Sequence, residues 1–186
     1  MAIHLRSSSR RTLLLSAAVG VTALSTSACQ SANPGDRQLV FTSWSDALRE
    51  LDRLAEAPKL STTAAWTWSQ TLNHCAQSIE YSLTGFPQAK SAVFQRSAGA
   101  LAFIVFSWRG RMSHDLAEPI PGAPALDAND AAVTAMARLR KAIADFQARS
   151  EPFKPHFAYG ELNKSEYELA HAMHLANHLS GFDLQV

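Results

Sequence analysis

Three histidines recur at helical spacing near the C-terminus, in the segment AHAMHLANHL that covers residues 170–179. Because an α-helix turns about 100° per residue, steps of three, four and seven residues place His171, His174 and His178 on one stripe. Asn163 and Glu166 precede this stripe with the spacing of a capping box, which predicts that the helix begins there. This helix is the first place to look for a chemical centre, since few sequence features bring three nitrogen ligands so close together.

Four more segments have the periodicity or the length of helices, with proline or glycine between them. The expected helices cover residues 43–57, 61–84, 88–109 and 127–148, and the histidine helix covers 163–179. Ser43 or Ser45 caps the first of them, and Asp127 or Asn129 caps the fourth. No segment alternates apolar and polar residues as a half-buried strand does. The sequence therefore predicts an all-α domain of about five helices, most simply a bundle.

Apolar side chains indicate which faces of these helices turn inward. The expected core stripe of the fourth helix is Val133, Met136, Leu139, Ile143 and Phe146. Core or pocket-wall positions are expected for Trp66, Trp68, Phe103, Phe106 and Trp108. The chain has two cysteines, which excludes a disulfide framework, and Cys75 is expected in the core.

The N-terminal segment has the features of an export signal. Arginines at positions 6, 10 and 11 precede an apolar run over residues 13–24, and small residues follow. Residues 9–14, SRRTLL, resemble a twin-arginine signal, which exports folded proteins, with a general secretory signal as the alternative. Ala28 and Cys29 resemble a lipoprotein cleavage box, although Thr26 stands where leucine is usual.

These features divide the chain into an export signal over residues 1–29, a linker over 30–42 and a helical domain over 43–186. The expected location is the periplasm or cell envelope, with membrane contact only through the signal or a lipid anchor on Cys29. The formal net charge is +1, from 17 basic and 16 acidic residues, which argues against a nucleic-acid partner. A small-molecule substrate is the expected partner, and a homodimer is left open.

His74 lies midway along the second expected helix, and an antiparallel bundle can bring it opposite the last helix. Two histidines four residues apart on one helix, with a third from another helix, give three nitrogen ligands on one side of a metal ion. The side left open suits water or a substrate, as in a catalytic zinc site. Zinc is the first candidate for the divalent ion, and nickel, iron and manganese fit the ligand type as well.

Four segments carry a resemblance to a known group. They are residues 68–78 (WSQTLNHCAQS), 114–122 (HDLAEPIPG), 155–160 (PHFAYG) and 174–179 (HLANHL). Together they resemble the DinB-like superfamily of metal-dependent hydrolases and, within it, a domain family of unknown function. The resemblance implies a four-helix bundle with an additional helix, and a divalent metal held by His74, His174 and His178. Relatives in the superfamily include thiol-dependent transferases and isomerases, while the family itself has no established reaction.

The remaining polar residues near the expected site have more than one possible role. His171 lies outside the HxxxH of the family and is expected beside the ligands or at the surface one turn earlier. A ligand pair of His171 and His174 is a further alternative. His156 could be a fourth ligand, a substrate contact or a general base, and it is the first candidate for proton transfer. His114 could also reach the site from its loop, beside the ligands or as an alternative ligand, or it could form an acid/base pair with Asp115. Gln77 could orient a ligand, or only reflect the polarity of its helix.

The sequence thus supports an exported metal-binding bundle that acts as a metal-dependent hydrolase or a thiol-dependent transferase. A non-catalytic envelope module that binds a metal or another ligand is the alternative, and a purely structural protein with a degenerate site is the third. A closed site with four protein ligands would favour the binding module. An open site that faces a cleft would favour the enzyme.

Overall fold

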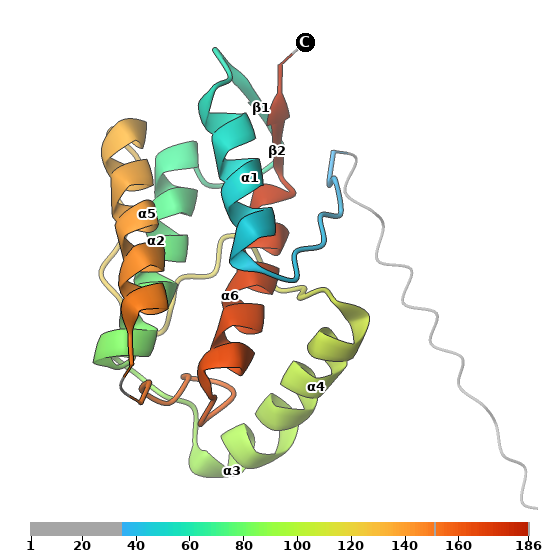
Figure 1. Cartoon of the computed structure of the whole chain (residues 1–186), viewed down its shortest axis with the longest axis vertical. Helices are drawn as coiled ribbons and strands as arrows, with labels where there is room; N and C mark the ends of the chain where they lie inside the picture. Colours follow the sequence, from blue (N-terminus) through green and yellow to red (C-terminus); the bar gives the residue numbers. More distant parts are fainter. Residues whose placement is uncertain (1–34, 151, 186) are drawn as a thin grey trace, which may run out of the picture. The chain divides into compact units, whose positions relative to one another are not determined.

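The computed structural model describes residues 35–150 and 152–185, so the expected signal, Cys29 and the first part of the linker lie outside the described residues. The helices are α1 (Trp44–Ala55), α2 (Trp68–Thr84), α3 (Ala92–Phe94), α4 (Ala100–Arg109), α5 (Ala132–Ala148) and α6 (Lys164–Leu179). A π-helical segment, η1 (Gln95–Gly99), joins α3 to α4, so the described chain has five helical rods (Figure 1). The mostly helical fold is confirmed.

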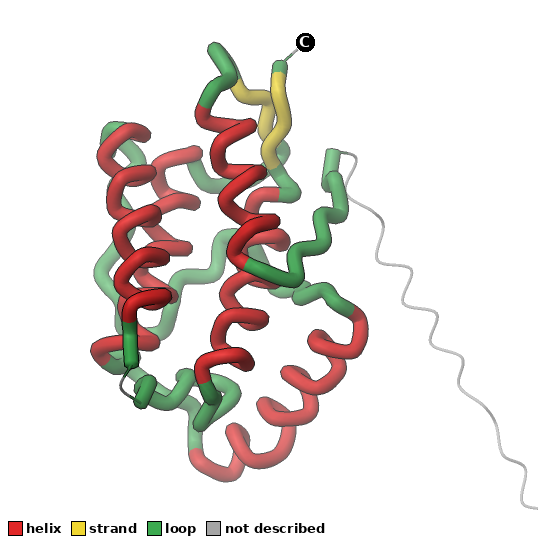
Figure 2. Tube along the Cα trace, viewed as in Figure 1, coloured by secondary structure: helices red, strands yellow, loops and turns green. Residues whose placement is uncertain are grey.

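The structure contains a small antiparallel sheet that the sequence does not predict. Strand β1 (Leu60–Thr62) pairs with β2 (Phe182–Leu184), and Ser61 lies opposite Asp183 (Figure 2). The strands are three residues each, too short to show an alternating pattern. The sheet fastens the end of the chain, just after α6, to the segment that leads into α2.

Three helix starts differ from the prediction. The third expected helix begins at Ala92 and not at residue 88, because the Ser91 side chain accepts a hydrogen bond from the backbone N–H of Phe94. Helix α2 begins at Trp68 and not near residue 61, because Thr67 and Gln70 form its capping box while residues 60–62 pair with β2. Helix α5 begins at Ala132, because the side chain of Asp127 accepts a hydrogen bond from the backbone N–H of Asn129 within a turn of its own. The predicted start of α6 is confirmed, with Asn163 and Glu166 in a capping box.

The core lies where α1, α2, α5 and α6 meet, with α2 packed on α5 and α6, and α1 packed on α6 (Figure 1). Leu139, Ile143 and Phe146 of α5 and Cys75 of α2 are buried as predicted. Val133 is 77 % exposed, so its predicted core position is wrong. It precedes Leu139 by six residues, about 600° of helix, and therefore points away from the buried face.

The described part of the expected linker, residues 35–42, packs against the helices. Phe41 is buried, and the Arg37 side chain donates to the Leu179 carbonyl oxygen at 3.0 Å and pairs with Glu50. The backbone N–H of Arg37 donates to the Ser180 carbonyl oxygen at 3.0 Å. These contacts attach residues 35–42 to the C-terminal end of α6.

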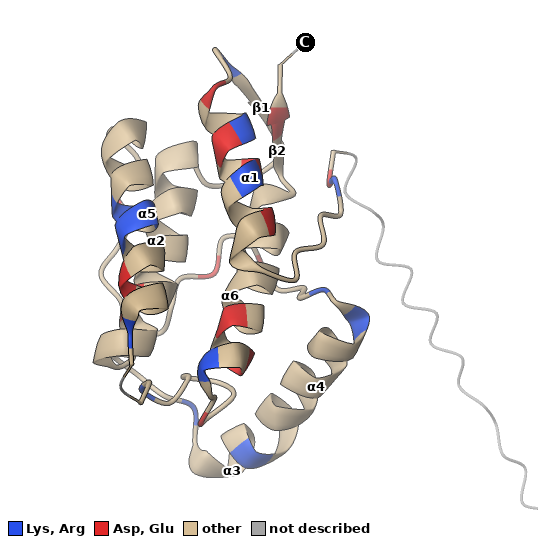
Figure 3. Cartoon of the chain, in the orientation of Figure 1, with Lys and Arg blue, Asp and Glu red and all other residues tan. Residues whose placement is uncertain are grey.

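Helix α4 stands apart from the other helices and, beyond its own rod, contacts α6 along one face (Figure 1). At Gly99 an added Cβ would lie 2.0 Å from the Ala158 carbonyl oxygen, so only glycine allows the helix to approach residues 152–163. The outer face is apolar, with Trp108 85 % exposed, which overturns its predicted place in a core or pocket wall. Arg96 and Arg109 are the charged residues of the α3–α4 rod (Figure 3). None of the described helices is long and apolar enough to cross a membrane.

Candidate metal centre

Three histidines from two helices converge at the centre of the domain. His74 comes from α2, and His174 and His178 come from successive turns of α6. One ring nitrogen from each lies within 4.8 Å of the other two, and His74 Nε2 is 3.2 Å from His174 Nε2. The ring centroids of His174 and His178 are 4.6 Å apart, as the four-residue spacing requires. The expected pairing of the two helices therefore brings these three residues together.

The donor set fits a metal ion. Burial lowers the pKa of His74 to about 3, and it holds the pKa of His174 and His178 well below the usual value. All three imidazoles are therefore neutral near pH 7, which is the form that binds metals. His178 Nε2 is buried without a hydrogen-bond partner. A divalent ion bound by the cluster would give that nitrogen a partner. A hydrogen bond between His74 and His174 leaves it without one, because that bond does not involve His178.

Trp66 closes one side of this cluster. Its ring lies parallel to that of His178, with centroids 6.1 Å apart and an interplanar angle of 4°. It also meets the ring of His74, at 4.8 Å. Trp66 thus packs against the histidine cluster, but it is not among the residues that line the cavity. His74 Nδ1 points to no protein acceptor among the described residues, so no carboxylate orients that ring.

A fourth histidine reaches the cluster from the long loop over residues 110–131. The ring centroid of His114 is 5.2 Å from that of His174 and 5.0 Å from that of His178. His114 Nδ1 lies 2.8 Å from the Asp115 carbonyl oxygen, so the ring carries its proton on Nδ1 and leaves Nε2 as an acceptor. The Asp115 carboxylate bonds the backbone N–H of Ala117 instead, so the predicted acid/base pair of His114 and Asp115 is not formed.

Polar side chains on α2 hold this loop in place. Gln77 Nε2 donates to the Pro124 carbonyl oxygen at 3.3 Å, and Gln70 Nε2 donates to the Leu126 carbonyl oxygen at 3.2 Å. Gln77 is therefore bonded to the loop and not to a ligand histidine. It still serves the centre indirectly, because the loop that it anchors carries His114.

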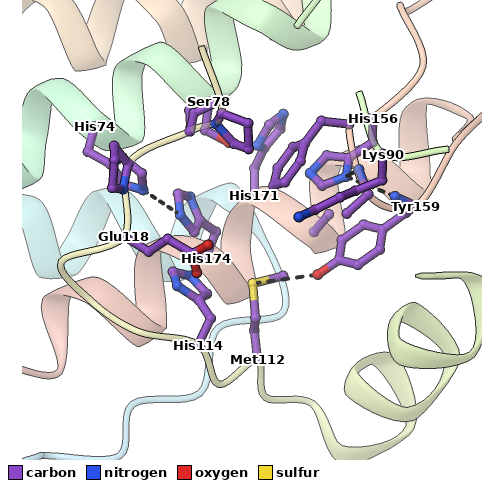
Figure 4. A pocket seen from close by; sticks show the side chains of 16 residues that line it. His74, Ser78, Lys90, Met112, His114, Glu118, His156, Tyr159, His171 and His174 are labelled. Carbon is purple, nitrogen blue, oxygen red and sulfur yellow. Dashed lines mark hydrogen bonds between the residues drawn. The ribbon is translucent and has the colours of Figure 1, made fainter. Parts of the chain in front are cut away.

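A cavity of about 220 Å³ opens beside the cluster (Figure 4). His74, His114 and His174 line one end of it, and Glu118 lies at this end too. The negative charge of Glu118 acts on His114 and opposes the lowering of its pKa by burial. Apolar side chains form much of the wall, namely Met112, Pro119, Ile120, Pro121, Phe157 and Ala170. The three-histidine group is thus open on the side that faces this cavity.

His156 lines the cavity but stands apart from the three ligand nitrogens. His156 Nδ1 accepts hydrogen bonds from the backbone N–H groups of Ala158 and Tyr159, both at 3.2 Å. The neutral ring therefore carries its proton on Nε2. Burial, with the neighbouring His171, lowers the pKa of His156 to about 3. These bonds favour a hydrogen-bond donor over the proton-transfer role expected from the sequence.

His171 also lines the cavity, one turn before His174. Its ring stacks on Tyr167, with centroids 5.3 Å apart, and lies 5.9 Å from that of Trp44. Burial lowers its pKa to about 3, and its Nε2 has no hydrogen-bond partner. The residue belongs to the aromatic packing next to the centre, and the group of nitrogens within 4.8 Å does not include it.

Sequence reasoning missed Lys90, Glu118 and Tyr159 as cavity residues. Glu118 and Tyr159 lie inside two of the segments that carry the family resemblance, which was the available signal. Lys90 lies two residues before the start of α3 and belongs to no motif. Its place follows only from the bond between its backbone N–H and the Phe157 carbonyl oxygen, at 2.8 Å.

Comparison with known proteins agrees with the extent of the folded domain. The family model described as "Protein of unknown function (DUF1569)" matches residues 34–184, which span all the helices and strands above. Neither a curated protein nor a solved structure matches the chain. The match covers far more than half of the sequence, and the chain belongs to the DUF1569 family.

Proposed function

We propose that the protein is a metal-dependent enzyme in which His74, His174 and His178 hold one divalent ion. The observation that carries the proposal is the convergence of three neutral imidazoles beside an open cavity. Catalytic zinc sites use three protein ligands and keep one position open, whereas structural zinc sites are closed by four. Zinc is therefore the first candidate, and nickel, iron and manganese accept the same nitrogen ligands.

The residues around the open side suit hydrolysis or transfer to a thiol. A divalent ion held by the three histidines would supply Lewis acidity there and would lower the pKa of a water or thiol. His114 Nε2 would accept the proton, because its Nδ1 is committed to the Asp115 carbonyl oxygen. The negative charge of Glu118 stabilises the imidazolium that results. His114 thus replaces His156 as the first candidate for proton transfer.

The resemblance to the DinB-like superfamily supports the same chemistry. Its relatives include metal-dependent hydrolases and thiol-dependent transferases, and a four-helix bundle with an additional helix agrees with the helical rods described above. The cavity of about 220 Å³ suits a small-molecule substrate. The enzyme acts in the cell envelope after export through the twin-arginine-like signal of residues 1–29.

A non-catalytic module that binds metal in the envelope is the second candidate, and one observation favours it. His114 lies close enough to His174 and His178 to become a fourth ligand after a modest loop movement. Four protein ligands would close the site. The number of protein ligands on the bound ion therefore separates the two candidates.

Metal analysis tests the proposal. The mature chain, purified without an affinity tag, should contain about one equivalent of divalent metal, and the His174→Ala variant should contain none. His171→Gln is the matched control, because His171 lies on the same helix outside the ligand group, and it should keep the full equivalent. Absence of metal from the folded wild-type protein, after exposure to zinc, nickel, iron and manganese, would overturn the proposal.

A further inference from the structure

The cavity has two chemically different ends. The histidine end carries His74, His114, His174 and Glu118, as described above. The opposite end is formed by Lys90, His156 and Tyr159, and Figure 4 shows the Lys90 ammonium and the Tyr159 hydroxyl directed toward the space between the two ends. These three residues belong to the loops on either side of the pocket, before α3 and before α6.

His156 offers this end a hydrogen-bond donor and no acceptor. Its Nδ1 is already bonded to two backbone N–H groups, so the proton lies on Nε2. The backbone of His156 also exchanges two hydrogen bonds with Gly160, at 2.7 and 3.0 Å, which closes the loop into a tight turn. The ring is therefore held rigidly, and it is neutral in the folded protein because of its burial.

Tyr159 offers a second donor. Its ring lies flat on that of His156, with centroids 4.3 Å apart and an interplanar angle of 9°. Burial raises the pKa of Tyr159 to about 12, so the hydroxyl keeps its proton. The one hydrogen-bond partner of this hydroxyl among the described residues is the weak acceptor Met112 Sδ, at 4.0 Å. The hydroxyl can thus donate to a better acceptor.

Lys90 adds a full positive charge. Its backbone is fixed to the Phe157 carbonyl oxygen, and its side chain lines the cavity. Each ion pair among the described residues involves an arginine or Lys141, so Lys90 is matched with no carboxylate there. Glu118, the acidic residue of the lining, lies at the histidine end.

We propose that Lys90, His156 and Tyr159 bind a carboxylate group of the substrate at the end of the cavity away from the histidines. One cation and two neutral donors match the single charge and several lone pairs of a carboxylate. Apolar side chains of the lining, among them Met112, Ile120 and Phe157, would contact a short apolar body of the ligand. The substrate is thus a small monocarboxylate whose reacting bond faces His74 and His174. That last assignment rests on the proposed function, while the carboxylate site itself needs no metal.

Binding of simple probes to metal-free protein tests the carboxylate site alone. Hexanoate and hexan-1-ol share an apolar chain and differ in charge, and calorimetric titration of chelator-treated wild-type protein compares them. Hexanoate should bind about tenfold more tightly than the alcohol, as expected for hydrogen bonds to a charged group. Equal affinities, or no measurable binding of hexanoate, would overturn the proposal.

Single variants identify the residues. Lys90→Met should weaken hexanoate about tenfold and leave hexan-1-ol unchanged, and Tyr159→Phe should weaken hexanoate several-fold. Lys59→Met and Tyr81→Phe are the matched controls outside the cavity and should bind hexanoate as the wild type does. Circular dichroism and thermal melting confirm that each variant is folded. An unchanged hexanoate affinity in folded Lys90→Met would contradict the assignment.

The same titration separates this inference from the proposed function. Hexanoate binding by a protein that takes up no metal would overturn the metal-dependent enzyme and keep the carboxylate site. One equivalent of metal in a protein that does not distinguish hexanoate from hexan-1-ol would keep the metal centre and overturn the carboxylate site.

Discussion

At the scale of single residues, hydrogen bonds show which ring nitrogen of a histidine carries its proton, which the position of the residue alone does not show. His114 and His156 both line the cavity, yet one carries its proton on Nδ1 and the other on Nε2. His114 can therefore accept a proton, while neutral His156 can only donate a hydrogen bond. Two residues that look equivalent in the sequence thus have opposite roles in the proposed reaction.

His114 is predicted to act beside the metal and not to hold it. The His114→Ala variant should keep about one equivalent of metal, with an affinity within about tenfold of the wild type. His178→Ala should lose the metal, because one of its ring nitrogens belongs to the converging group of three. Competition with a chelating dye measures both affinities. Loss of the metal in His114→Ala would show that four histidines close the site.

At the scale of elements, loops and helix α4 decide how the cavity is built. Gln95 of η1 donates to the His156 and Phe157 carbonyl oxygens at 3.3 and 3.2 Å, and Phe103 of α4 meets the ring of Tyr159. The α3–α4 rod therefore supports the loop that forms the donor end. Helix α2 supports the other loop through Gln70 and Gln77.

Gly99 is predicted to be essential for the contact between this rod and the loop. The Gly99→Ala variant places a methyl group against the Ala158 carbonyl oxygen, so the backbone has to shift. The free energy of unfolding should fall by about 1–3 kcal/mol, even though alanine favours helix by up to about 1 kcal/mol. Ser97→Ala, an exposed change in the same π-helical segment, should stay within about 0.5 kcal/mol of the wild type. Urea denaturation of all three proteins checks this, and equal stability of Gly99→Ala and wild type would contradict it.

At the scale of the whole molecule, the domain buries its histidines where most proteins bury apolar residues. Five of the six described histidines line one cavity, and His178 completes the ligand group behind it. Removing an imidazole from water disfavours its charged form. The metal-free fold is therefore sensitive to acid over the range in which exposed histidines are protonated.

For His156, the direction in which the free energy of unfolding changes with pH can be derived. Its pKa is about 3 in the folded protein and about 6.5 in an unfolded chain, so between these values the unfolded state binds more protons. The stability that neutral His156 contributes is present above pH 6.5 and is lost as the pH falls toward 3. The His156→Asn variant keeps an acceptor for the two backbone N–H groups. In metal-free protein, the free energy of unfolding of the wild type should rise with pH between pH 4 and 6. The His156→Asn variant should lower this slope by about 1.4 kcal/mol per pH unit. Parallel slopes for variant and wild type would refute this.

The parts of the fold that local signals encode were predictable from the sequence. The capping box of Asn163 and Glu166 and the spacing of His174 and His178 each act within one or two turns of helix. His74 required one further assumption, that antiparallel helices face each other, and the bundle satisfies it. Placement of the three histidines together followed from the period of the helix and the family resemblance.

The loops and the sheet were not predictable in the same way. Strand β1 pairs with residues more than 100 positions later in the chain, and no local pattern encodes that pairing. The roles of His114 and His156 depend on backbone atoms of residues that follow them, which spacing alone does not reveal. Lys90 enters the cavity only because its backbone bonds a distant loop.

The distance along the chain between His74 and His174 has a thermodynamic consequence. The two residues are 100 positions apart, so an ion held by both would join distant parts of the polypeptide as a crosslink does. Binding to the native state alone adds about 2.7 kcal/mol to its stability when free metal is at one hundred times the dissociation constant. The availability of metal in the compartment would then govern how long the folded protein survives there, quite apart from any reaction that it catalyses.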